Sequence, residues 1–308
     1  MSDSKVLVVG SVAYDDVETP HGRRENLLGG SATYFSVAAS RFAAPRLVGV
    51  VGSDFEPADR AMLAEHGVDL DGLEVDESGG TFRWGGRYHE NMNDRDTLFT
   101  HLNVFTRFEP KIPAAYTTSE FAFLGNIDPE LQLGVLDQLD SPRFVGLDTM
   151  NFWIEGKRDA LEKVLSRIDG LFVNDEEGAL LTDRGTALTI GRALQSMGPS
   201  TVVLKRGEHG ALLFHGEEIF HVPAYPLENV VDPTGAGDTF AGGFFGYLTR
   251  CGSMDDDSLR RAMICGSIMA SFCVEGFGLD RLRGVTLKDI EKRYAKFTAL
   301  TRCPDLTL

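Results

Sequence analysis

The chain has 308 residues, of which 43% are hydrophobic and 25% are charged, so it can bury the core of one large α/β domain and lacks the composition of a disordered protein. Its 46 acidic residues outnumber its 30 basic ones, which gives a formal net charge of −16. Because no global positive field attracts phosphate backbones, this charge argues against nucleic acid and anionic membranes as partners, while a local site for a small anion stays open.

The cysteines and the apolar runs favour a soluble, cytoplasmic protein with reduced thiols. The sequence contains four cysteines, at Cys251, Cys265, Cys273 and Cys303. Their spacing matches no metal-ligand pattern, so we expect most of them in the core. The first apolar run is too short for a signal sequence, and the run Ala262–Val274 is too short to cross a bilayer.

Taken in chain order, short apolar runs alternate with longer amphipathic ones. The expected buried strands are Lys5–Val9, Arg46–Val51, Phe121–Leu124, Phe144–Leu147, Leu171–Val173 and Thr201–Leu204. The expected helices between them are Gly30–Phe42, Pro57–His66, Pro129–Leu139, Lys157–Ile168 and Thr186–Met197. Strands separated by helices predict βαβ units, and therefore a three-layer α/β fold in which helices cover both faces of a mostly parallel sheet.

The pattern changes after residue 210. Two short runs, Ala211–Phe214 and Glu218–Val222, surround a turn at His215-Gly216, which predicts an antiparallel hairpin. Three further helices are expected to close the chain, at Gly235–Arg250, Asp256–Val274 and Leu287–Phe297.

Two segments, residues 12–28 and 76–110, break the alternation. The second contains no good helix, but its stretches TFRWGGRYH and DTLFTHLNVF alternate like exposed strands, and the first is similar in character. We expect the two segments to form a small β-rich lid on a single domain that spans residues 1–308; the alternative is a long irregular loop. The aromatic residues Trp84, Tyr88 and Phe99 could stack on a base, cover a sugar face, form the core of the lid or make a dimer contact.

The most informative stretch is VVDPTGAGDTFAGGFFGYL, which begins at residue 230. Gly235 and Gly237 permit a backbone that places N–H groups in a concave nest, and a long helix follows at once. Free N–H groups at a helix N-terminus bind a phosphate or a developing anion, and the same field favours ionised Asp238 in the first turn. Phosphoryl transfer to an alcohol needs both parts, so we predict Asp238 as the base and the amides of Gly235, Ala236 and Gly237 as the anion hole.

This stretch has other interpretations. It could be a plain glycine-rich turn in which Asp238 caps the helix. A dinucleotide-binding fingerprint fits poorly, because Phe240 stands where the third glycine should be, and no such fingerprint follows the first strand. The sequence contains no GxxxxGK[ST] segment, which excludes a Walker-type loop.

The segment Asp232–Phe240 resembles the C-terminal signature of the ribokinase-like (PfkB) family of carbohydrate and nucleoside kinases. Other segments match the family in the right order across nearly the whole chain. They are Gly10–Asp15, the pair Gly29-Gly30, Asn174-Asp-Glu-Glu177 and Val203–Gly210. The resemblance implies a ribokinase-like fold and an ATP-dependent kinase that phosphorylates a hydroxyl of a sugar or sugar-like acceptor. A nucleoside kinase is the alternative within the family, and a catalytically silent ligand-binding relative is a further one.

The resemblance also implies roles for individual residues. The acceptor is expected at Asp15, Gly29, Gly30 and Tyr34. The nucleotide is expected at Asn174, Glu177, Lys205, Gly207, Thr234 and Gly278, with Mg²⁺ near Glu177 and Asp232. Each role has a plainer alternative: Asn174 and Glu177 could form a helix capping box, Lys205 could be a solvated strand-end lysine, and the glycine pair could be a simple turn.

One position departs from the family pattern. Pentose-binding members commonly have an asparagine where this chain has Tyr34, which weakens the expectation of ribose specificity. Asp148 and Asn126 follow strand ends and could also line the site. A monovalent cation and a homodimer formed through the lid are left open.

Overall fold

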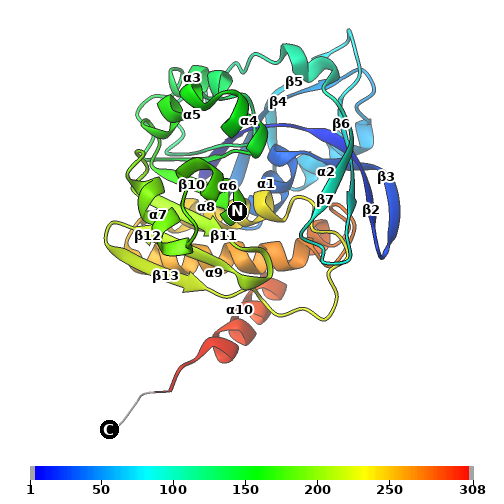
Figure 1. Cartoon of the computed structure of the whole chain (residues 1–308). Coiled ribbons are helices and arrows are strands. Elements are labelled where there is room, and N and C mark those ends of the chain that lie inside the picture. The colour runs from blue at the N-terminus through cyan, green and yellow to red at the C-terminus, as the bar shows by residue number, and fades with distance from the viewer. Residues whose placement is uncertain (1–3, 305–308) are drawn as a thin grey trace.

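The structure is a computed structural model that describes residues 4–304, and it contains two separate β-sheets (Figure 1). Within these residues the main sheet has nine strands, in the order β13-β12-β11-β10-β9-β8-β1-β4-β5. Their bounds are β1 (Lys5–Val9), β4 (Ala44–Gly52), β5 (Asp69–Asp76), β8 (Phe121–Leu124), β9 (Phe144–Asp148), β10 (Gly170–Asn174), β11 (Thr201–Lys205), β12 (Ala211–His215) and β13 (Glu218–Val222). From β5 to β11 all neighbours pair in parallel, and β12 and β13 extend the sheet as an antiparallel hairpin.

Helices cover both faces of the main sheet, because alternate residues of each buried strand point to opposite sides. Val6 and Val8 of β1 pack with one group of helices, and Leu7 and Val9 pack with the other. The first group is α1 (Ser31–Ala39), α2 (Pro57–Glu65), α8 (Ala236–Cys251), α9 (Asp256–Cys273) and α10 (Leu287–Thr301). The second group is α3 (Pro129–Leu136), α4 (Asn151–Gly156), α5 (Arg158–Leu165), α6 (Asp175–Thr182) and α7 (Ala187–Gln195). No helix within residues 4–304 is long and apolar enough to cross a membrane.

The second sheet, called the small sheet below, consists of β3 (Gly22–Gly29), β2 (Ala13–Thr19), β6 (Phe82–Tyr88) and β7 (Arg95–His101), in that order. Strand β2 pairs in parallel with β6, and the two outer pairs are antiparallel. Asp15 of β2 stands opposite Leu27 on one side and Trp84 on the other, so these three side chains share one face of the sheet. Trp84 and Tyr88 pack on this face near Phe277 of the main domain.

The structure confirms the predicted three-layer fold, the C-terminal hairpin and the last three helices, each to within a few residues. One strand and two α-helices were missed, and the end of the stretch DTLFTHLNVF forms the short 3-10 helix Asn103–Arg107 where an exposed strand was expected. Strand β5 has acidic residues at four of its eight positions, which hides its apolar pattern because it lies at the sheet edge. Helices α4 and α6 have only six and eight residues and show no clear helical period.

Candidate active site

The N-terminus of α8 has the open geometry that the glycine-rich stretch predicts. Gly235 is the N-cap residue, with φ 72° and ψ 4°, and no side chain caps the helix. A Cβ on Gly235 would overlap the ring of Tyr34, so only glycine fits this position. Among residues 4–304, the N–H groups of Gly235 and Gly237 have no hydrogen-bond acceptor. The Ala236 N–H instead donates to the Pro233 carbonyl at 3.2 Å, so two of the three predicted amides are free.

A lysine and three carboxylates meet beside these amides. The Lys205 ammonium lies so close to the helix start that a Cβ on Gly237 would be 2.9 Å from Nζ. The same Nζ is 3.4 Å from Oδ2 of Asp148. Asp148 and Lys205 are the last residues of β9 and β11, and the strand between them, β10, leads into α6, which carries Glu177. Parallel strands therefore bring these groups to the carboxyl edge of the sheet, where α8 adds Asp238. We call Asp148, Glu177, Lys205 and Asp238 the acidic cluster.

Burial and mutual repulsion shift the pKa values of the acidic cluster. Burial, followed by the charge of Asp148, raises the pKa of both Asp238 and Glu177 to about 7, although the Lys205 ammonium opposes the rise. Burial alone would lower the pKa of Lys205, but the three surrounding carboxylates outweigh burial and raise it. The cluster thus holds one firmly charged ammonium beside two carboxylates, those of Glu177 and Asp238, that can gain or lose a proton near neutral pH.

Asn174 and Glu177 form a complete capping box at the start of α6. The Glu177 N–H donates to Oδ1 of Asn174 at 2.8 Å, and the Asn174 N–H donates to Oε2 of Glu177 at 2.8 Å. These residues therefore form the helix capping box that was the plainer alternative for them. The capping box also fixes the direction of the Glu177 carboxylate within the acidic cluster. Within the described part of the chain, no group of three or more His, Cys, Asp or Glu side chains is arranged to hold a metal. The carboxylate oxygens of the cluster fit Mg²⁺ that keeps waters and phosphate oxygens among its ligands.

Asp15, Gly29 and Gly30 lie together, as predicted. The Asp15 side chain is 4% exposed and lies directly against Cα of Gly29, where a Cβ would overlap its carboxylate. The nearby backbone N–H of Gly30 favours the ionised form of this carboxylate and so lowers its pKa. Burial, and then the charges of Asp232 and Asp238, raise the pKa of Asp15 to about 8. Asp15 and Asp238 are therefore close enough to repel each other, although they come from the small sheet and from α8.

The remaining predicted residues shape the loops around the site. Asp232 is buried, and its two oxygens accept hydrogen bonds from the N–H groups of Thr234 and Gly278, each at 2.9 Å. The Thr234 hydroxyl donates to the Tyr88 hydroxyl at 3.2 Å, which ties the small sheet to the loop before α8. Gly207 lies in the turn after β11 with φ 50°, and Asn93 of the turn between β6 and β7 lies near it. The metal role of Asp232 stays a prediction.

The aromatic residues of the predicted lid divide between its two faces. Trp84 and Tyr88 lie on the face that carries Asp15. Phe99 packs against Gly85 and stacks on His101 with ring centroids 4.9 Å apart, so it belongs to the opposite face. Sequence reasoning could not separate them, because the face of each residue depends on which residues of β6 and β7 stand opposite each other.

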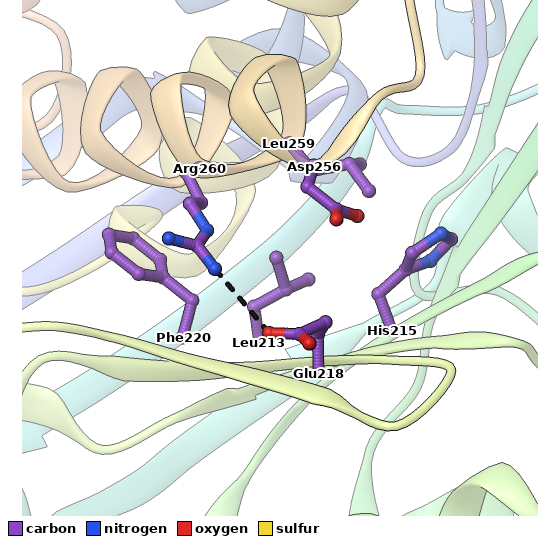
Figure 2. Close-up of a pocket in the computed structure, with 7 residues that line it drawn as sticks. All are labelled: Leu213, His215, Glu218, Phe220, Asp256, Leu259 and Arg260. Atoms are coloured by element: carbon purple, nitrogen blue, oxygen red, sulfur yellow. Dashed lines mark ion pairs between the residues drawn. The ribbon is translucent and has the colours of Figure 1, made fainter.

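A small surface hollow lies elsewhere, between the β12–β13 hairpin and the start of α9 (Figure 2). Arg260 of α9 approaches Glu218 of β13 at 3.5 Å across it, and its guanidinium lies over the ring of Phe220. None of the predicted site residues lines this hollow. It is therefore separate from the candidate active site.

Known proteins with similar sequences and structures agree on one family. The profile of the pfkB family carbohydrate kinase matches residues 142–279. Cytidine kinase of Thermococcus kodakarensis is 32% identical over 80% of this chain and 88% of its own length. Nucleoside kinase of Methanothermobacter thermautotrophicus is 27% identical over 96% of both chains. The crystal structure of Methanocaldococcus jannaschii nucleoside kinase shares the fold, with a TM-score of 0.77 at 19% identity over 95% of this chain and 98% of that one.

Proposed function

The chain belongs to the pfkB family of carbohydrate kinases, and within this family we propose that it is a nucleoside kinase. It is an ATP-dependent phosphotransferase that acts on a hydroxyl of a sugar or sugar-like acceptor. The two relatives described above are named cytidine kinase and nucleoside kinase, and they align with 80% and 96% of this chain. We therefore propose a ribose hydroxyl of a nucleoside as the phosphoryl acceptor.

The observation that carries this proposal is the row of side chains on the small sheet. Asp15 can bind sugar hydroxyls, and its neighbours across the two adjacent strands are Leu27 and Trp84. A free sugar would leave such an apolar and aromatic surface largely unused. A nucleoside would use both parts, since its ribose carries hydroxyls for Asp15 and its base can stack on an indole ring.

We assign the chemistry to the N-terminus of α8. Asp238, whose pKa is about 7, would take the proton of the attacking hydroxyl near neutral pH. The free N–H groups of Gly235 and Gly237 and the Lys205 ammonium would stabilise charge on the transferring phosphoryl group. Asp148 would hold Lys205 in place through the 3.4 Å ion pair.

The small sheet would act as a lid over this chemistry. Tyr88 of the small sheet reaches the loop that contains Thr234, and Asn93 of the β6–β7 turn reaches the loop that contains Gly207. A lid docked on both loops excludes water from the transferring group, which limits wasteful hydrolysis of ATP.

Three finer points are part of the proposal. Mg²⁺ would be held near Glu177, with Asp148 and Asp238 as the other carboxylates of the acidic cluster, and when bound with ATP it would neutralise charge on the phosphates. Titration with K⁺ and Na⁺ measures whether turnover depends on a monovalent cation. A homodimer would form through the small sheet, whose strand β7 exposes Leu98, and light scattering on the pure protein measures the mass.

A substrate panel tests the acceptor class. Purified protein is incubated with ATP and Mg²⁺ and with cytidine, uridine, adenosine, inosine, ribose or fructose, and ADP release is followed over time. We expect kcat/KM to be at least about tenfold higher for one or more nucleosides than for either free sugar. Mass spectrometry and phosphorus NMR then identify the phosphorylated hydroxyl. A higher kcat/KM for a free sugar would contradict the nucleoside proposal and leave the family assignment intact.

A further inference from the structure

Arg95 of the small sheet is an exposed cation whose guanidinium has no partner within residues 4–304. It is the first residue of β7 and stands directly opposite Tyr88 of β6, so the two side chains share one face of the sheet. Tyr88 is only 7% exposed on that face, where it packs near Phe277 of the main domain. Arg95 therefore belongs to the face that meets the main domain, and a ligand can still reach it.

Two contacts place this part of the small sheet beside the acidic cluster. The Tyr88 hydroxyl accepts a hydrogen bond from the Thr234 hydroxyl at 3.2 Å, immediately before the open end of α8. Asn93, two residues before Arg95, lies near Gly207 in the turn after β11. Both loops border the acidic cluster, so Arg95 is carried by the segment of the lid that touches the main domain on either side of it.

The charges at the site show that Arg95 acts on the acidic cluster. Burial, and then the charge of Asp148, raise the pKa of Glu177, and two cations oppose this rise, first Lys205 and then Arg95. Burial also raises the pKa of Tyr88 to about 12, and Arg95 is the largest influence against it. Lys205 is already paired with Asp148 at 3.4 Å. A polyphosphate placed beside three carboxylates is repelled by them, so it needs a cation that no carboxylate of the protein neutralises.

We propose that Arg95 is a catalytic residue whose guanidinium binds the phosphoryl group that passes from ATP to the acceptor. In this transfer the bond from the γ-phosphorus to the oxygen of ADP breaks, the bond to the acceptor oxygen forms, and the hydroxyl proton moves to Asp238. Arg95 keeps its own proton and stabilises the negative charge that moves with the phosphoryl group. The contact exists with bound ATP and strengthens during transfer. Lys205 acts from the main domain and Arg95 from the lid, so docking of the small sheet completes the site.

The kinetic test compares Arg95→Met with a matched control, Arg87→Met. Arg87 lies in the same sheet next to Tyr88, and therefore on the opposite face, where its Nε donates to Oε1 of Glu18 at 2.9 Å. With the best acceptor of the substrate panel, we expect Arg95→Met to lower kcat by about 100-fold and to leave the KM for the acceptor within about threefold. Arg95→Lys should recover part of the loss, because lysine keeps the charge but loses the forked geometry. Arg87→Met should stay within about threefold of wild type.

A binding measurement tests the same contact without turnover. Isothermal titration calorimetry in the presence of Mg²⁺ compares ADP with AMPPNP, a non-hydrolysable ATP analogue that carries the third phosphate. Arg95→Met should weaken the binding of AMPPNP by about tenfold and that of ADP by less than about twofold, because ADP lacks the group that Arg95 contacts. Arg87→Met should change neither affinity.

Equal kcat values for Arg95→Met and Arg87→Met would overturn the inference. So would a raised KM for the acceptor at unchanged kcat, which would place Arg95 at the acceptor, or an equal loss of ADP and AMPPNP affinity, which would place it away from the transferred phosphate. The inference concerns ATP, so failure of the proposed nucleoside kinase function looks different: the wild-type protein would phosphorylate a free sugar, and the variants are then compared with that sugar. If the wild-type protein phosphorylates no compound of the panel, the two affinities decide the role of Arg95.

Discussion

Helices α6 and α8 both begin at the candidate active site, but they differ in whether side chains of the protein cap their first N–H groups. At α6, the side chains of Asn174 and Glu177 close the helix end with two hydrogen bonds of 2.8 Å. At α8, the N-cap residue is Gly235, which offers no side chain, and the N–H groups of Gly235 and Gly237 stay free within the described residues. The first helix end is complete without a ligand, and the second is built to receive one.

The two helix ends therefore have different functions in one site. A capped end stabilises the fold and fixes the direction of a carboxylate, here that of Glu177. An open end costs stability, because its polar groups lack protein partners, and it gains a place where developing negative charge is stabilised. Mutations at the open end should therefore change catalysis, and mutations at the capped end should mainly change stability.

The largest expected effect is at Asp238. Asp238→Asn removes the base and keeps the side-chain volume, so we expect kcat to fall by about 10²- to 10⁴-fold with little change in the KM for ATP. The matched control is Asp175→Asn, in the first turn of α6, where the side chain is 45% exposed and lies 3.6 Å from Arg206. Its kcat should stay within about threefold of wild type. Comparable losses in both variants would mean that the two helix ends do not differ in function.

A methyl group at the open end should have the next largest effect. In Gly237→Ala the new Cβ would lie 2.9 Å from Nζ of Lys205, which pushes the ammonium away from the helix start without disturbing the core. Because small displacements of catalytic groups are costly, we expect kcat/KM to fall by about tenfold to 100-fold. Gly134→Ala in α3 is the control, since no atom of residues 4–304 lies within 4 Å of its added Cβ. Steady-state kinetics of both variants measure the effect. A Gly237→Ala variant as active as Gly134→Ala would contradict this expectation.

Local sequence was enough to predict the open helix end and not enough to predict its surroundings. The glycine spacing indicated a helix start near residue 235 with Asp238 in its first turn, and α8 begins at Ala236. The pairing of Lys205 with Asp148 could not be predicted from local sequence, because it depends on which strands are neighbours in the sheet. The free hydroxyl of Tyr34 was equally hidden, since only the packed structure shows that a buried group lacks a partner.

The pH dependence of activity tests the electrostatics of the open end. Asp238 must be ionised to act as a base, and its pKa is about 7, so kcat/KM should decrease as the pH falls below about 7. Lys205→Met removes a charge that lowers this pKa, so the acid limb should move to higher pH. Asp148→Asn removes a charge that raises it, so the acid limb should move to lower pH. Measured pH profiles of kcat/KM that shift in the same direction for both variants would contradict this assignment.

The smallest effect is expected at the capped end, and it needs a second capped helix for comparison. Asn174→Ala removes the cap of α6 and should lower the free energy of unfolding by about 1 kcal/mol. Thr286→Ala removes an equivalent capping box at the start of α10, where Thr286 and Asp289 bond each other away from the site, and should cost about the same. Urea unfolding measures both losses, which should be similar.

Kinetics should then separate these two variants. Loss of the Asn174 side chain removes the hydrogen bond that the Glu177 N–H donates to Oδ1 of Asn174, so the first turn of α6, which positions Glu177, is held less firmly. If Glu177 helps to hold Mg²⁺ and the nucleotide phosphates, Asn174→Ala should raise the KM for ATP several-fold and Thr286→Ala should not. An equal KM in both variants would mean that the capping box of α6 only stabilises the fold, and the contrast between the two helix ends would then rest on α8 alone.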